Sequence, residues 1–172
     1  MTVRKIEIER LTITSSKPFE AVVATLEAAI GRPDMAEFLN AARSATTYAE
    51  LQSVVQRSVS AAGLMLFMKL DAGAVVRKES RRVSPKSHRF LIGNPLTMKD
   101  MAKHVPEAAG YAPITVLVDE RPDGVHLGYD KMASCLAPYG NAEALAVARE
   151  LDAKVETLMQ EAAAATMVAG ST

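Results

Sequence analysis

Two side chains in this sequence have the chemistry of a general base. His88 shares one face of a predicted strand with Phe90 and Ile92, and an imidazole there could act as a base or bind a metal or a haem. A lone histidine on an apolar face is more often a hydrogen-bonded core residue. Lys69 ends an apolar run, and a cleft could lower the pKa of its amine enough for base or Schiff-base chemistry. The simpler interpretation is that its ammonium group extends to solvent at the sheet edge.

Two more polar residues lie where strands are predicted to end. Asn94 stands in an Ile-Gly-Asn-Pro sequence, where its amide could meet a ligand beside a helix N-terminus, although Asn-Pro is also common in turns. Tyr129 precedes Asp130, and a phenol beside a carboxylate could serve acid–base chemistry. Adjacent strand residues point to opposite faces, so a core tyrosine is the simpler interpretation. The candidate ligand-binding residues are therefore His88, Asn94, Tyr129 and Lys69, and the catalytic residues, if any, stay unknown.

Metal and cofactor motifs are not found in the sequence. Its three histidines and single cysteine, Cys135, are too dispersed for metal-ligand spacing. Neither a glycine-rich phosphate loop nor a nucleophile elbow is present. We expect no metal and no cofactor, although haem binding would leave no spacing signal. A single cysteine cannot form an intramolecular disulfide, which is typical of the reducing cytoplasm, and we expect a cytoplasmic protein.

The nine methionines suggest a further hypothesis. Their thioether side chains are flexible and polarisable, so a cluster of them can line an adaptable apolar pocket. Ordinary core filling is the alternative. The methionines concerned are Met65, Met68, Met98 and Met101.

The charge balance excludes a strongly basic surface. The chain has 20 Lys and Arg against 20 Asp and Glu, whereas nucleic-acid affinity depends on accumulated positive charge. The basic residues between Arg77 and Arg89 alternate with Ser and Glu rather than aromatic residues, which favours a solvated face. No stretch approaches the roughly 20 apolar residues that span a bilayer. We expect a soluble protein whose partners include neither nucleic acid nor membrane.

The elements that position the candidate residues follow from hydrophobic periodicity. Period-two and apolar runs predict strands over residues 3–14, 64–70, 87–94, 114–118 and 125–130, with a Pro-Asp-Gly turn joining the last two. The 64–70 run is apolar throughout, as in a strand covered on both faces. Helical spacing predicts helices over 19–30, in a pair within 34–62, over 97–105 and over 141–162. This order favours a single α+β domain over residues 1–172, with a mostly antiparallel sheet packed by helices.

Four segments of the sequence have a recognisable pattern: Pro18-Phe19-Glu20-Ala21-Val22 after the first strand, Ile92-Gly93-Asn94-Pro95, the 106–113 approach to a Val-rich strand, and Gly128-Tyr129-Asp130. They resemble the bacterial and archaeal family called domain of unknown function 302. The resemblance covers residues 3–31 and 62–160. It implies a strand–helix–multistrand–helix α+β fold, shaped like the TATA-binding protein, and a homodimer; it implies no activity. Lys131 stands where that family often has proline, and the helical pair 34–62 has the character of an insertion.

Three functional interpretations stay open. The first is a dimeric domain that binds a small apolar or anionic ligand between the sheet and the helical pair, near Asn94, His88 and Tyr129. The second is a cofactor-independent enzyme of small-molecule metabolism that uses His88 or Lys69 as its base. An enzyme needs that base within hydrogen-bond reach of a second polar group in an open cavity.

The third interpretation is a structural protein-interaction module. In that case the helical pair 34–62 would form the dimer surface. Phe38, Leu39 or Val54 would then be exposed in the monomer and covered in the dimer.

Overall fold

An antiparallel five-stranded sheet forms the centre of the computed structural model, which describes residues 1, 3–81, 83 and 85–164. The strand order is β1-β5-β4-β3-β2, and every neighbouring pair is antiparallel. The predicted α+β class is confirmed. The strands are β1 (Arg10–Ser15), β2 (Met65–Asp71), β3 (Ser87–Gly93), β4 (Ile114–Arg121) and β5 (Gly124–Asp130).

Helices account for most of the rest of the described chain. They are α1 (Phe19–Ala29), α2 (Met35–Ser44), α3 (Tyr48–Ser58), α4 (Ala74–Ser80), α5 (Pro95–Ala102), α6 (Met132–Leu136) and α7 (Ala142–Ala163). Two short 3₁₀ helices, η1 (Pro106–Gly110) and η2 (Ala137–Tyr139), precede β4 and α7. The strand–helix–multistrand–helix frame therefore runs from β1 and α1, through β2 to β5, to α7.

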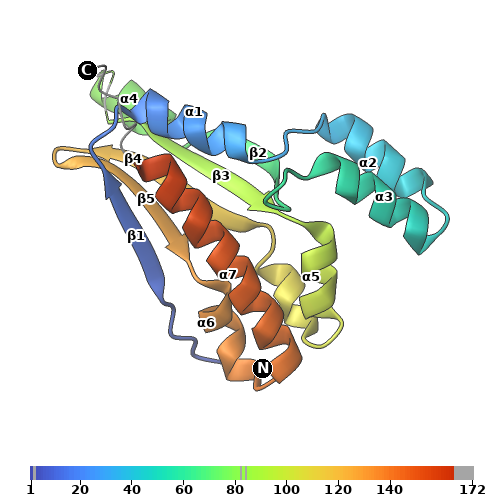
Figure 1. Cartoon of the computed structure of the whole chain (residues 1–172). Coiled ribbons are helices and arrows are strands. Elements are labelled where there is room, and N and C mark those ends of the chain that lie inside the picture. Colours follow the sequence, from blue (N-terminus) through green and yellow to red (C-terminus); the bar gives the residue numbers. More distant parts are fainter. Residues whose placement is uncertain (2, 82, 84, 165–172) are drawn as a thin grey trace, which may run out of the picture.

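Helices α1 and α7 cover one face of the sheet (Figure 1). Alternate residues of the central strands, such as Phe90, Val116 and Leu127, point to that face and are fully buried. They meet apolar stripes of the two helices, which recur every three or four residues, as in Leu26 of α1 and Val155 of α7. The main core therefore lies between the sheet and these two helices.

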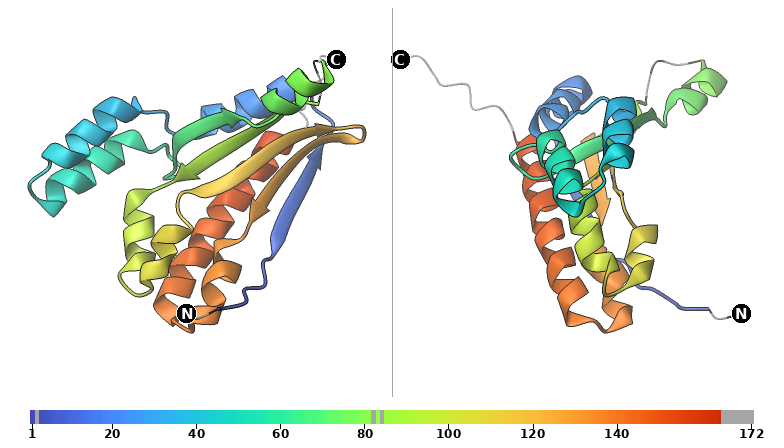
Figure 2. Two further views of the ribbon diagram at one scale, coloured as in Figure 1. Left: turned by 180° about the vertical axis from the view of Figure 1, so that it is seen from behind. Right: turned by 90° about the vertical axis from the view of Figure 1, so that its right-hand side faces the viewer.

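The opposite face of the sheet carries no long helix in the described part of the chain. Seen from behind, the strands lie in front of α7 (Figure 2, left). Most residues that alternate with the buried ones are half-buried or exposed on this side, among them Arg89, Thr115 and Leu117. We call this side the open face.

Helices α2 and α3 project beyond the sheet beside α5 (Figure 1). The predicted capping box at the start of α3 is confirmed, because the Thr47 hydroxyl accepts a hydrogen bond from Glu50 N and the Glu50 carboxylate accepts one from Thr47 N. Phe38 of α2 and Val55 of α3 bury their side chains in a second, small cluster with Met65 of β2. The pair is thus attached to the end of β2 by apolar packing.

Two strand predictions are wrong in part. The first strand begins at Arg10 rather than at residue 3, because the Glu9 backbone bonds instead to Ser134 Oγ and Lys131 N near α6. The apolar run at 64–70 is a strand, but it lies at the sheet edge and is not covered on both faces. Its residues Met68 and Leu70 are 49% and 41% exposed.

Candidate functional site

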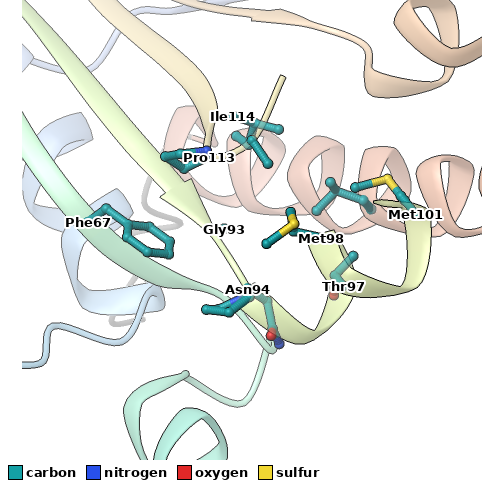
Figure 3. Close-up of a pocket in the computed structure, with 11 residues that line it drawn as sticks. Phe67, Gly93, Asn94, Thr97, Met98, Met101, Pro113 and Ile114 are labelled. Carbon is teal, nitrogen blue, oxygen red and sulfur yellow. The ribbon is translucent and has the colours of Figure 1, made fainter. Parts of the chain in front are cut away.

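A cavity of about 240 Å³ lies where β3 ends and α5 begins (Figure 3). Two strand ends meet at the cavity, because β3 ends here at Gly93 and β4 begins at Ile114, directly after Pro113. Helix α5 closes one side, and Leu151 of α7 contributes from below the sheet. The lining residues are Phe67, Gly93, Asn94, Pro95, Thr97, Met98, Met101, Ala112, Pro113, Ile114 and Leu151.

The cavity wall is almost entirely apolar. Asn94 contributes an amide, but its Oδ1 accepts a hydrogen bond from Leu96 N at 2.8 Å and its Nδ2 donates to Gly63 O at 2.9 Å. This cap starts α5 and ties it to the segment before β2. Thr97 has the other polar side chain of the described wall. A ligand inside the cavity would therefore be held by apolar contact rather than by charge.

Glycine at position 93 creates part of this space. A Cβ added there would meet Phe67 and Pro113 at 3.6 Å, which is ordinary van der Waals contact. Figure 3 shows the rings of Phe67 and Pro113 and the thioether of Met98 around Gly93. Because Gly93 has no side chain, a ligand atom can occupy this space in ordinary contact with Phe67 and Pro113.

Two of the four methionines that were considered as pocket residues line the cavity. Met98 and Met101 belong to α5 and take part in its wall. Met65 is buried in the second cluster with Phe38 and Val55 instead, and Met68 is exposed on β2. Methionine side chains on α5 give the cavity an adaptable wall.

A wider groove of about 590 Å³ lies on the open face. Its floor carries ion pairs: Arg10 with Asp130, and Arg121 with Asp119. His126, which the alternation places on this face, is 8% exposed because it lies between Thr14 and Asp123, at 3.5 and 2.9 Å. The groove therefore contains charged side chains, which the described wall of the cavity beside α5 lacks.

His88 lies away from both of these hollows. It follows Ser87 on β3, and its ring packs against Phe19 of α1 with centroids 5.0 Å apart. Burial and the nearby Lys69 ammonium lower the pKa of the imidazole. Its Nδ1 is buried and has no hydrogen-bond partner among the described residues. The Nδ1 atom is therefore not hydrogen-bonded to a second polar group, although charged side chains such as Lys69 and Asp71 act on the ring.

Lys69 lies on the edge strand β2, and a sheet-edge position was the simpler interpretation of this residue in the sequence analysis. Its Nζ is 2.8 Å from Glu27 Oε1 of α1 and lies over the Phe90 ring, 5.7 Å from the centroid. The ammonium is therefore paired with a carboxylate at the edge of the sheet.

Tyr129 is fixed in a buried hydrogen-bond network. Its hydroxyl donates to Asp152 Oδ1 at 2.6 Å, and burial together with this carboxylate raises the pKa of the phenol. The same carboxylate accepts hydrogen bonds from Met132 N at 2.8 Å and Ala133 N at 3.0 Å, at the start of α6. The network thus joins β5, α6 and α7. Asp130, the partner considered for Tyr129 in the sequence, pairs with Arg10 at the surface instead.

The structural role of Asp152 was not predicted from the sequence. It follows Leu151 and precedes Val155 by three positions, so it lies on the apolar stripe of α7. A carboxylate on such a stripe is the available signal, because a buried charge needs several hydrogen bonds. The other missed residues, Phe67, Gly93 and Pro113, carry no chemical signal in the sequence.

The described residues hold no group of three metal-ligating side chains, and no helix among them is long and apolar enough to cross a bilayer. The expected absence of metals and cofactors stays a prediction.

The comparisons with known proteins agree with this fold. A family model described as "Domain of unknown function DUF302" matches residues 39–162, more than two thirds of the chain. The chain belongs to the DUF302 family. A crystal structure of an uncharacterized conserved DUF302 protein from Bacillus stearothermophilus has a similar fold, with a TM-score of 0.62 at 10% identity, over 89% of this chain and 97% of that one. No match was found among curated proteins.

Lys131, where the sequence was expected to depart from the family, makes a backbone hydrogen bond. It precedes α6, and its N–H donates to Glu9 O at 2.9 Å. Proline has no N–H and could not make this bond. The DUF302 match begins within α2, and the insertion at 34–62 stays a prediction.

Replacing Tyr129 by phenylalanine tests the buried network. Tyr129→Phe leaves Asp152 buried with one donor fewer, and we expect the free energy of unfolding to fall by about 1–3 kcal/mol. Tyr48→Phe is the matched control, because Tyr48 is 52% exposed and bonds only to Lys99 at the surface. We expect the control to change stability by less than about 0.5 kcal/mol. Urea denaturation of both variants measures the difference, and equal losses would contradict a structural role for the phenol.

Proposed function

We propose that this protein binds a small apolar ligand in the cavity beside α5. The observation that carries the proposal is the cavity itself, whose described wall has apolar side chains apart from Asn94 and Thr97. Preformed apolar hollows with few polar groups are the usual form of small-molecule sites. The volume of about 240 Å³ suits a ligand of few atoms. Of the four candidate residues, Asn94 is the one that supports this site, by fixing the start of α5.

The enzyme interpretation receives less support. His88 and Lys69 line neither the cavity beside α5 nor the groove. The His88 ring lies against Phe19, and the Lys69 ammonium is paired with Glu27. A general base must reach the proton that it removes from a bound substrate, so binding is the better supported function.

A single methyl group tests the binding proposal. Gly93→Ala places a methyl in the cavity in ordinary contact with Phe67 and Pro113. The variant should fold and bind 1-octanol about fourfold more weakly. The added methyl group displaces about one methylene of the probe from the cavity, and burial of one methylene contributes about 0.8 kcal/mol to binding. Isothermal titration calorimetry with 1-octanol measures this.

Gly110→Ala is the matched control for the same experiment. A Cβ at Gly110 meets nothing within 4 Å, and Gly110 does not line the cavity. We expect wild-type affinity for 1-octanol in this variant. Absence of binding to the wild-type protein, or equal weakening in both variants, would overturn the proposal.

We infer that the protein also forms a homodimer, through the neighbouring helix α4 and the outer edge of β2 beyond Leu66, where Gly31 no longer pairs with the strand. Here four large apolar side chains are exposed: Met68 by 49%, Leu70 by 41%, Val75 by 76% and Val76 by 50%. An edge strand has unpaired backbone groups that can pair with another strand. Two copies related by a twofold axis would cover the same patch on each.

The helical pair supports the alternative dimer surface less well. Phe38 is 7% exposed, and Val54 is half-buried beside it, because both pack in the cluster around Met65. Of the three residues considered, only Leu39 is well exposed, by 44%.

We also propose that residues 34–62 are an insertion in one domain over 1–172, because β1 and β2, before and after them, belong to one sheet. A cytoplasmic location remains part of the proposal and fits the free thiol of Cys135.

A charge at the β2 edge tests the dimer. Leu70→Lys puts an ammonium group into the proposed interface, and we expect sedimentation to show dimers in the wild-type protein and monomers in this variant. Leu39→Lys is the matched control with nearly equal exposure, and it should remain dimeric. A wild-type monomer would contradict the dimer. Loss of the dimer in Leu39→Lys alone would assign the interface to the helical pair.

A further inference from the structure

The cavity beside α5 and the groove on the open face adjoin each other. Pro113 and Ile114 line both hollows, at the point where the chain enters β4. One hollow has an apolar wall and the other a charged floor. A molecule placed across this boundary would therefore meet apolar side chains at one end and charged groups at the other.

The groove has one positive charge that no carboxylate balances. Among its described residues are three arginines, Arg10, Arg89 and Arg121, and two aspartates. Arg10 and Arg121 are paired with Asp130 and Asp119. No carboxylate among the described residues lies within 4.0 Å of Arg89, which bonds to the Thr115 hydroxyl instead.

Thr115 holds the Arg89 guanidinium close to the boundary. The Nε and Nη2 atoms of Arg89 donate to Thr115 Oγ1 at 3.3 and 3.1 Å. Thr115 lies two residues after Pro113 on β4, which is about 7 Å along the strand and on the same face. The Nη1 side of the guanidinium keeps free N–H groups in this arrangement, and two adjacent nitrogens of arginine suit the two oxygens of a carboxylate.

We propose that the ligand is an amphiphile with one anionic head group, whose apolar tail fills the cavity beside α5 and whose head binds Arg89. This ligand class rests on the small-ligand function proposed above. A short-chain carboxylate has the required chemistry, because its acid group is ionised at neutral pH. The apolar wall accounts for the tail, and the unpaired guanidinium accounts for the head.

A matched pair of probes tests the head group. Octanoate and 1-octanol have the same chain length, and calorimetry at pH 7.5 gives their affinities for the full-length protein. We expect octanoate to bind about tenfold more tightly, as one charge-assisted hydrogen-bonded pair would provide. In Arg89→Gln the two affinities should become equal, with that for 1-octanol unchanged.

Arg121→Gln is the matched control, because Arg121 lies in the same groove but is paired with Asp119. It should keep the preference for octanoate. Thr115→Val removes the acceptor that positions Arg89 and should reduce the preference without abolishing it. Gly93→Ala should weaken both probes alike, since both place their tail in the cavity.

The outcomes separate this inference from the proposed function. Octanol binding that depends on Gly93, without any preference for octanoate, would leave the cavity function intact and overturn the anionic head group. An octanoate preference that survives Arg89→Gln would also overturn it. Co-sedimentation with phosphatidylglycerol vesicles that is lost in Arg89→Gln would show a lipid head group in a membrane, and would overturn the assignment to a free amphiphile.

Discussion

One-sided burial of the sheet is the constraint on which the rest of this structure depends. Alternating residues of β3, β4 and β5 place Phe90, Val116 and Leu127 against α1 and α7, where they are fully buried. The intervening residues must then face the other way. Because no long helix covers that side in the described chain, it can carry arginines and aspartates without the cost of burying charge. The charged groove follows directly from the apolar core behind it.

The cavity arises at the end of the same sheet, where the two-residue alternation stops. Beyond Gly93 the chain turns into α5, and Asn94 fixes that turn through one hydrogen bond from Nδ2 and one to Oδ1. Asp152, which directly follows the cavity residue Leu151 on α7, fixes α6 and Tyr129 through buried hydrogen bonds. Both polar groups therefore hold helices in place. The features left for a ligand are the apolar wall and Arg89, which has no carboxylate partner among the described residues.

The sequence predicted the frame well because the frame depends on periodicity. The α+β class, the 114–130 hairpin, the capping box at Thr47 and the long last helix all follow from local patterns. The site was predicted only through Asn94, Met98 and Met101, since residues from four separate stretches of the chain meet at the cavity. Pairings such as Tyr129 with Asp152, or Lys69 with Glu27, join residues 23 and 42 positions apart. No local pattern fixes such distances, and the edge position of β2 depends likewise on the order of the strands.

The methyl groups of the methionines offer the most direct test of the central claim, that the cavity beside α5 is a ligand site. Methionine ε-methyl labelling with ¹³C gives separate NMR signals for Met98 and Met101 in the wall, and for Met159, which is buried and lines neither the cavity nor the groove. On titration with 1-octanol, we expect saturable shifts for Met98 and Met101, and a fixed signal for Met159. Unchanged Met98 and Met101 signals, or equal shifts at all three methyl groups, would contradict the claim.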